Sequence, residues 1–272
     1  MSSEQPSAET DPLEIEHSQR ILALLERVDQ LNAALQNHLD VAAGSRLTFD
    51  DERLPNFPVS SYGYAQLSAA LGCLQSLGRM AIRETEDTVT MTLGPYGAYA
   101  LVRNALDCAA TALWMLEPVN STLRVKRRLL LGVEEVQNWA AFRRSVDWPW
   151  AAWKTNKRAR LKAVADLAGL GAWNPLKAEL PSMTSILSGL EHRHQEATLP
   201  WLSAWQLASG HAHGKLWSNV VSHNLDALEG TRTATGATYR VTIKYGMLHV
   251  LLYESVQLID VAAQRYVELA ER

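Results

Sequence analysis

Two apolar stretches of the sequence, residues 98–116 and 205–217, each carry a pair of polar residues at helical spacing. The polar residues, which are four positions apart within each stretch, are Arg103, Asp107, Ser209 and His213. Residues four apart lie on the same face of a helix, and a polar group that folding buries needs a hydrogen-bonding partner. We therefore predict two core helices that pack against each other and bring these four side chains together.

The Arg103–Asp107 pair allows two interpretations. It is either a narrow solvent-exposed face on a core helix, as is usual for charged side chains, or a buried ion pair that meets the polar residues of the second stretch. The second stretch also contains Gly210 and Gly214. A glycine inside a helix costs about 1 kcal/mol relative to alanine, and the usual reason for it is the close approach of another helix. We expect one of these glycines where the two helices come closest.

Helical periodicity dominates the sequence and predicts an all-α fold class, a multi-helix bundle with one small β-hairpin near residues 231–243. Threonine and β-branched residues on both sides of Gly236 carry the hairpin signal. We expect a disordered tail over residues 1–12, a long N-terminal helix with its connector over 13–58, and the helical bundle domain over 59–272.

Apolar residues of the N-terminal helix follow the three-four spacing of a helix seam, at Ile21, Leu24, Val28, Leu31 and Leu35. Such a stripe packs either against an antiparallel helix of the same chain or against a second copy. We favour a partner inside the chain, because neighbouring leucines make the stripe wider than a two-stranded seam. A homodimer through this helix is the alternative.

The bulk composition is that of a globular protein. The chain has 272 residues, a formal net charge of −3 and 47% hydrophobic residues, which is enough for a large core. Its N-terminal residues lack the basic and apolar regions of a signal peptide, and its most apolar run is short for a membrane span. Two isolated cysteines, Cys73 and Cys108, favour a reduced environment. We expect a cytoplasmic protein without a membrane partner.

Basic residues are concentrated between residues 124 and 162, where eleven Lys or Arg stand against three acidic residues. Four tryptophans lie in the same segment, and basic residues with aromatic neighbours are typical of a nucleic-acid surface. The other interpretation is a solvated face whose charge is balanced by acidic neighbours in space. For RNA as the partner, the candidate binding residues are Arg124, Arg127, Arg128, Lys157 and Arg158.

Histidines occur in two His-x-His pairs, at residues 192 and 194 and at residues 211 and 213. Zinc sites prefer spacings such as His-Glu-x-x-His, and residues two apart diverge by about 200° on a regular helix. We predict structural or surface roles for these histidines, with no metal and no cofactor.

Two segments of the sequence resemble known proteins. They read Arg-Asn-Ala-Leu-Asp-Cys-Ala-Ala-Thr-Ala-Leu-Trp over residues 103–114 and Ala-Ser-Gly-His-Ala-His-Gly over residues 208–214. They look like a group of helical bacterial proteins common in actinobacteria and, more loosely, are similar to HEPN-type helical bundles. That superfamily includes toxin and phage-defence ribonucleases, which pair an acidic helix residue with an Arg-x-x-x-x-His motif. The resemblance implies that Asp107 matches the acidic residue and His213 the histidine, while Ala208 stands where the motif has arginine.

Two functional hypotheses result. The first is a HEPN-like protein associated with RNA or defence, with a site of Arg103, Asp107, Ser209 and His213. In RNA cleavage, His213 would be the general acid or base and Arg103 would stabilise the developing charge on the phosphate. The second is a non-catalytic interaction module whose polar quartet only fixes the geometry of the core. An opening to solvent would favour the first hypothesis.

Overall fold

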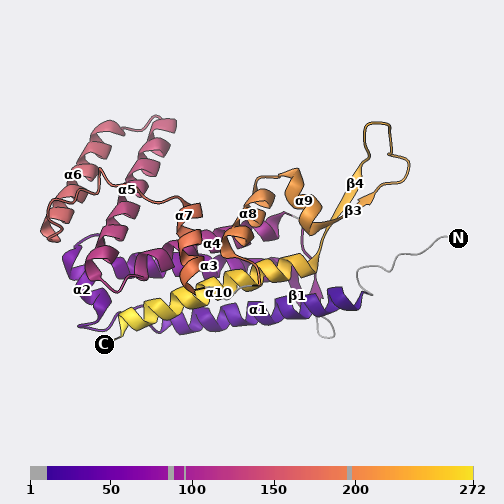
Figure 1. Cartoon of the computed structure of the whole chain (residues 1–272), viewed down its shortest axis with the longest axis horizontal. Coiled ribbons are helices and arrows are strands. Elements are labelled where there is room, and N and C mark those ends of the chain that lie inside the picture. Colours follow the sequence, from indigo (N-terminus) through magenta and orange to yellow (C-terminus); the bar gives the residue numbers. More distant parts are fainter. Residues whose placement is uncertain (1–10, 85–88, 95, 195–197, 272) are drawn as a thin grey trace. The chain divides into compact units, whose positions relative to one another are not determined.

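The computed structural model describes residues 11–84, 89–94, 96–194 and 198–271, and ten helices make up most of them (Figure 1). Two small antiparallel sheets of two strands each accompany the helices. The predicted all-α class, a multi-helix bundle with a small hairpin, is therefore confirmed. Most of the predicted N-terminal tail, residues 1–10, lies outside the described residues.

The helices begin and end close to capping residues and breakers that are visible in the sequence. The helices of the described residues are α1 (Pro12–Gln36), α2 (Arg46–Arg53), α3 (Val59–Ala81), α4 (Gly97–Leu116), α5 (Ser121–Ser145), α6 (Ala151–Leu167), α7 (Met183–His194), α8 (Trp201–Ala212), α9 (Leu216–Ser222) and α10 (Tyr245–Ala270). Asn120 caps α5 through its side chain, which accepts the N–H of Thr122 at 2.8 Å. Ser45 caps α2 in the same way through Thr48.

The predicted hairpin is present but starts earlier than expected. Strand β3 (His223–Ala227) pairs antiparallel with β4 (Tyr239–Ile243). Helix α8 ends before Gly214, which has φ +62°. A left-handed glycine is a common end of a helix because it has no Cβ to clash. A second pair of strands, β1 (Ile82–Glu84) and β2 (Val89–Met91), was not predicted.

The chain divides into two compact units, each assembled from three separate stretches. Unit 1 contains Met1–Ala33, Ser68–Ala109 and Leu187–Asp260, and unit 2 contains Ala34–Leu67, Ala110–Ile186 and Val261–Arg272. The two stretches that carry the predicted polar quartet both contribute to unit 1. The basic segment between residues 124 and 162 belongs to unit 2.

The core of unit 1 buries the apolar stripe of α1. Ile21 and Val28 are buried among side chains of the same chain, and the Arg27 guanidinium donates to the Asp260 carboxylate on α10 at 3.1 Å. The stripe therefore packs inside the chain, as we favoured. A homodimer through α1 stays a prediction and would use the outer face of this helix.

Helix α10 is long and apolar enough to cross a membrane, by length and composition alone. However, 56% of its most apolar window is buried inside the protein, where Leu248, Leu251 and Leu252 lie in the core of unit 1. Burial of this kind is typical of a core helix.

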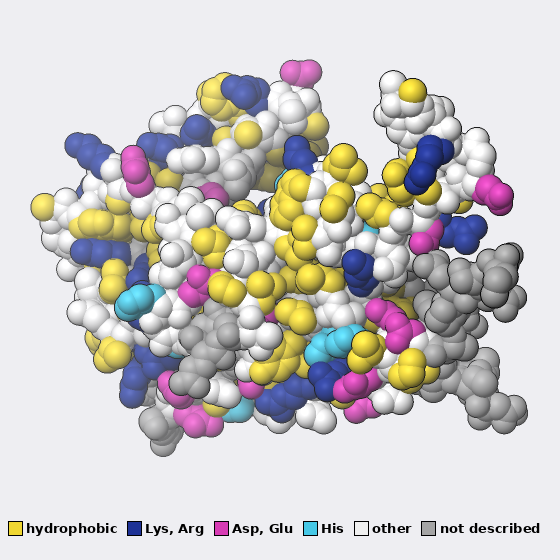
Figure 2. Space-filling view, turned by 45° about the vertical axis from the view of Figure 1, so that its right-hand side comes forward, with side chains coloured by type: hydrophobic (Ala, Val, Ile, Leu, Met, Phe, Trp, Pro, Cys, Tyr) yellow, Lys and Arg dark blue, Asp and Glu magenta, His cyan; other side chains and the backbone are white. Residues whose placement is uncertain are grey.

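Unit 1 also carries an apolar surface. Helix α9 exposes Leu216, Trp217, Val220 and Val221, each to at least 49%. Figure 2 shows hydrophobic side chains, in yellow, gathered beside the β3–β4 hairpin. Because soluble proteins rarely expose contiguous apolar patches, such a surface is a candidate for contact with another molecule.

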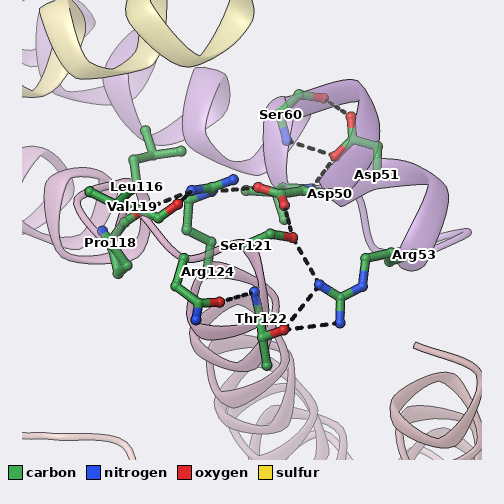
Figure 3. Close-up of polar contacts among 12 residues, drawn as sticks. Asp50, Asp51, Arg53, Ser60, Leu116, Pro118, Val119, Ser121, Thr122 and Arg124 are labelled. Atoms are coloured by element: carbon green, nitrogen blue, oxygen red, sulfur yellow. Dashed lines mark hydrogen bonds and ion pairs between the residues drawn. The ribbon is translucent and has the colours of Figure 1, made fainter. Parts of the chain in front are cut away.

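Unit 2 is built around a buried ion pair between α2 and α5 (Figure 3). Asp50 and Arg124 are 0% and 1% exposed, and Arg124 Nε donates to Asp50 Oδ2 at 2.5 Å. Arg124 Nη1 donates to the carbonyl oxygens of Pro118 and Val119 at 2.7 and 2.8 Å. The Ser121 hydroxyl donates to the other carboxylate oxygen of Asp50. A buried charge needs both an opposite charge and hydrogen bonds, and this site supplies them.

Two neighbours of Asp50 extend this network to other helices. Asp51 Oδ1 accepts the backbone N–H of Ser60 in the first turn of α3 at 3.1 Å, while burial raises the pKa of the Asp51 carboxyl. Arg53 Nη1 donates to Ser121 Oγ at 2.8 Å, and Arg53 Nη2 donates to the carbonyl oxygen of Ala168 at 2.9 Å. The eight-residue helix α2 thereby ties together α3, the start of α5 and the end of α6.

We predict that Asp50→Ala lowers the free energy of unfolding by about 3–5 kcal/mol, because it leaves the Arg124 guanidinium buried without a counter-charge. Urea denaturation followed by circular dichroism measures the loss. The matched control is Asp166→Ala, whose carboxylate pairs with Lys162 on the surface of α6 and is 53% exposed; its cost should be about 0–1 kcal/mol. Equal losses in the two variants would contradict the prediction.

Candidate functional site

The Arg103–Asp107 pair lies on α4 at the boundary between the core and solvent. Arg103 Nη1 is 3.1 Å from Asp107 Oδ2, and the two side chains are 32% and 20% exposed. Trp205 of α8 completes the site, because its indole Nε1 donates to Asp107 Oδ1 at 2.6 Å and its ring lies 5.8 Å from the Arg103 guanidinium carbon. Helices α4 and α8 are therefore in contact, as predicted, and the pair is neither fully buried nor fully solvated.

Ser209 and His213 do not join this pair. Among the described residues, neither side chain forms a hydrogen bond with Arg103 or Asp107. His213 is exposed and follows the end of α8, so it no longer shares a helix face with Ser209. The prediction that the four polar residues meet was wrong in this respect. It placed Ser209 and His213 on one helix face, whereas α8 ends at Ala212, and the Asp107 carboxylate accepts from Trp205, one turn before Ser209.

Gly210 and Gly214 are glycines for two different structural reasons. A Cβ at Gly210 would lie 2.7 Å from Cζ2 of Trp217 and 3.0 Å from Cβ of Ser218. The close approach that we predicted therefore occurs, but between α8 and α9 rather than between α8 and α4. Gly214 has no heavy atom within 4 Å of an added Cβ, and its requirement is the left-handed backbone of the turn between α8 and α9.

A second polar cluster, which we did not predict, lies at the end of α8. His211 is 1% exposed, stacks on the Tyr99 ring with centroids 4.0 Å apart, and meets the edge of the His223 ring at 4.7 Å. His211 Nε2 hydrogen-bonds to Ser222 Oγ, which also donates to the carbonyl oxygen of Ser218 at 2.7 Å. The sequence analysis considered His211 only as part of the His-x-His pair with His213. No sequence pattern indicated the aromatic ring that covers it.

This cluster has a structural role and not a catalytic one. Burial, and then the neighbouring His223, lower the pKa of His211 from 6.5 to about 4. The ring is therefore neutral near pH 7, and it is shielded from any dissolved substrate. Within the described residues, no group of three or more His, Cys, Asp or Glu side chains could hold a metal ion.

Three of the five residues predicted to contact nucleic acid point into unit 2 instead. For these three the prediction was wrong. Arg124 is buried against Asp50. Arg128 is 7% exposed, and its guanidinium carbon lies 4.0 Å from the centre of the Tyr62 ring. The side chain of Arg127 lies over the Trp114 ring at 4.9 Å and also pairs with a carboxylate, that of Glu117, at 3.5 Å. The physical reason is position: these arginines occupy the end of α5 that packs against α2.

The far end of the α5–α6 hairpin carries the remaining candidates and a group of exposed aromatic rings. We call this end the aromatic–basic tip and define it by its members, Trp139, Phe142, Arg143, Arg144, Trp148, Trp150, Trp153, Lys154, Lys157 and Arg158. Figure 1 shows α5 and α6 side by side, with this tip at the end opposite α2. Lys157 and Arg158, from the predicted set, are partly exposed on α6.

The charge of the tip is not balanced locally. Residues 137–160 contain six Lys or Arg and one acidic residue, Asp147, although the whole chain has a net charge of −3. Among the described residues, no carboxylate oxygen lies within 4.0 Å of a charged nitrogen of any of the six. The interpretation as a solvated face neutralised by acidic neighbours therefore lacks those neighbours. A surface with unpaired cations and exposed rings can bind an anionic, ring-containing polymer.

Comparisons with protein-family models, curated proteins and solved structures give no match for this chain. The resemblance to HEPN-type proteins stays a prediction.

We predict that Asp107→Ala lowers the free energy of unfolding by about 1–3 kcal/mol, because it removes a charged hydrogen-bond acceptor from Trp205 in a partly buried site. Asp107→Asn is the matched control, since the amide oxygen can still accept from Nε1 and the loss should be about 0–1 kcal/mol. Denaturant unfolding compares the two variants. A cost of about 3–5 kcal/mol for Asp107→Ala would instead indicate a fully buried pair.

We predict that His211 makes the protein less stable as the pH falls from about 6.5 to about 4. In that range the unfolded chain binds a proton on this histidine while the folded chain does not, so stability is full above pH 6.5 and declines by up to about 1.4 kcal/mol per pH unit. The measurement is urea unfolding across this range. His211→Gln should flatten the pH dependence relative to the parent, and His213→Gln, at an exposed position, should not. Identical slopes for both variants would exclude His211 as the source.

Proposed function

We propose that this chain is a non-catalytic RNA-binding protein that contacts its ligand through the aromatic–basic tip. The observation that carries the proposal is the group of five cations of the tip, which lie among aromatic rings and have no acidic partners among the described residues. Phosphate groups supply the missing counter-charge, and release of their counter-ions drives association. A cytoplasmic setting agrees with the two free cysteines, Cys73 and Cys108.

Binding is favoured over catalysis by the arrangement around α4. A ribonuclease of the HEPN type would need its histidine next to the acidic residue. Here His213 lies exposed beyond the end of α8, while Asp107 faces Arg103 and Trp205. His211 is buried, and its lowered pKa keeps it neutral. A HEPN-like or defence-associated role would therefore rest on RNA binding rather than on cleavage by this site.

The test is the salt dependence of RNA binding, measured by fluorescence anisotropy with a labelled RNA. With five contacts, the slope of log K against log salt should be about −3.5 for a single strand. Replacing Arg144, Lys157 and Arg158 together with glutamate should weaken binding on the order of 100-fold at low salt. The proposal fails if the parent chain binds no RNA at low salt.

A triple variant with the same change of charge serves as the control. Arg46, Arg79 and Lys177 are exposed and lie outside the tip, so their replacement with glutamate tests net charge alone. Binding that falls equally in both variants would assign the affinity to overall charge and not to the tip.

A second candidate function is that of a protein-interaction module. The exposed residues of α9, Leu216, Trp217, Val220 and Val221, favour it, and an open pocket of about 390 Å³ lies beside Trp217 and Val221. An apolar segment of another protein would cover such a surface. Absence of RNA binding in the experiment above would make this candidate the leading one.

A further inference from the structure

We infer that the aromatic–basic tip binds single-stranded nucleic acid, with unpaired bases stacked on its exposed ring faces. This inference rests on the proposed function and adds the class of ligand. The contacts within the tip indicate it, because the rings and the cations are arranged as separate elements for bases and for phosphates.

Three rings of the tip form one packed group. Trp139 and Phe142 are stacked with centroids 5.2 Å apart and planes 15° apart, and Trp148 stands edge-on to both, at 6.5 and 6.0 Å. The three residues are still 43%, 46% and 50% exposed. Each ring is therefore held in place by its neighbours while a large part of its surface remains open, which lowers the entropy cost of stacking a base on it.

Arg143 fixes the loop that carries Trp148. Its Nε donates to the carbonyl oxygen of Pro149 at 2.8 Å, and its guanidinium carbon lies 5.9 Å from the Trp148 ring and 5.2 Å from the Trp153 ring. The backbone N–H of Trp148 donates to the carbonyl oxygen of Arg143 at 2.8 Å. Asp147 takes a left-handed conformation, φ 55°, which turns the chain between α5 and α6. The ring platform is thus positioned by the backbone as well as by packing.

The cations of the tip lie on both helices of the hairpin. Arg144 follows Arg143 at the end of α5 and is exposed, while Lys154, Lys157 and Arg158 lie on the facing helix α6. Lys157 Nζ is 5.9 Å from the Trp153 ring. Phosphates therefore find positive charge on both helices of the hairpin while bases reach the rings between them.

A duplex and a membrane fit this arrangement less well. Bases of a duplex are stacked on one another and present no free face to a protein ring. A membrane-binding helix separates an apolar face from a charged one, whereas Arg143 lies between the Trp148 and Trp153 rings. Intermixed rings and cations are the pattern of single-strand binding sites.

The experiment compares four probes on the full chain by anisotropy or co-sedimentation. They are a labelled RNA without self-complementarity, the same sequence as a blunt duplex, an abasic oligonucleotide of equal phosphate number, and vesicles of phosphatidylserine with phosphatidylcholine. Single-stranded RNA should bind about 10-fold or more tightly than the abasic strand, because stacking contributes where charge is equal. Equal affinity for the single strand, the duplex and the abasic strand would overturn the inference.

Two substitutions make the test specific to the ring. Trp148→Leu should weaken single-strand binding about 5- to 100-fold and leave binding of the abasic strand unchanged, since it removes a stacking surface but no charge. Trp217→Leu is the matched control, because Trp217 is 51% exposed and lies on α9 of unit 1, and it should not change binding. Far-ultraviolet circular dichroism and the melting temperature verify that both variants are folded.

The outcomes separate this inference from the proposed function. If no RNA binds at low salt, the proposed function fails, and the inference fails with it. If RNA binds with a steep salt dependence but Trp148→Leu has no effect, the stacking inference fails and RNA binding stands. If Trp148→Leu weakens binding to the vesicles and not to RNA, the tip is a lipid-surface site and the inference is overturned.

Discussion

Burying the Asp50 carboxylate against the Arg124 guanidinium obliges the chain around them to supply hydrogen bonds to both groups. Arg124 donates to the carbonyl oxygens of Pro118 and Val119, and Asp50 accepts from the hydroxyl of Ser121. The two carbonyls and the hydroxyl belong to the turn before α5 and to its first residue, so the position of α5 on α2 is set by electrostatics as much as by packing. The rest of unit 2, including the direction in which α5 leaves the core, depends on this pair.

Helix α5 places its arginines in two different environments along its length. At its first turns, arginines are neutralised by Asp50 and Glu117 or covered by the rings of Trp114 and Tyr62. At its last turns, arginines are left without carboxylates among the described residues and lie among exposed rings. A single run of basic residues in the sequence therefore has a structural half and a half that is available for binding. The candidate function follows from that division and not from the total charge.

Much of the fold could be predicted because helical periodicity reports directly on burial. In the predicted apolar stripe of α1, for example, Ile21, Val28, Leu31 and Leu35 are buried. The short helix α2 was missed, since its eight residues are mostly polar and their apolar face is a single buried Leu47 beside Asp50. That omission also hid the partner of Arg124, while the partners of Arg127 and Arg128, Glu117 and Tyr62, lie outside α5 and could not be found from its spacing. Local spacing identifies which residues share a helix face, but it does not identify the element that faces them.

In the candidate site of unit 1, too, local spacing identified shared helix faces but not everything that meets them. The sequence correctly indicated that the stretches around Asp107 and Trp205 would be in contact. It could not show that the helix stops before His213, because a lone glycine is compatible both with a helix interior and with its end. The buried group of His211, Tyr99 and His223 joins residues more than a hundred positions apart. No periodicity connects such positions.

The two glycines at the end of α8 have a consequence for the genetics of this region. Position 210 excludes a side chain by volume, because the Trp217 ring occupies the space. A smaller residue at 217 therefore relieves the closest contact of Gly210→Ala, while Ser218 Cβ stays 3.0 Å from the added Cβ. Position 214 disfavours most L-residues by handedness, since nothing lies within 4 Å of an added Cβ but the backbone has φ +62°. A D-residue introduced by chemical synthesis satisfies that position, whereas no second mutation of a neighbouring side chain relieves it. Glycines that look equivalent in the sequence are thus constrained by shape at one site and by chirality at the other.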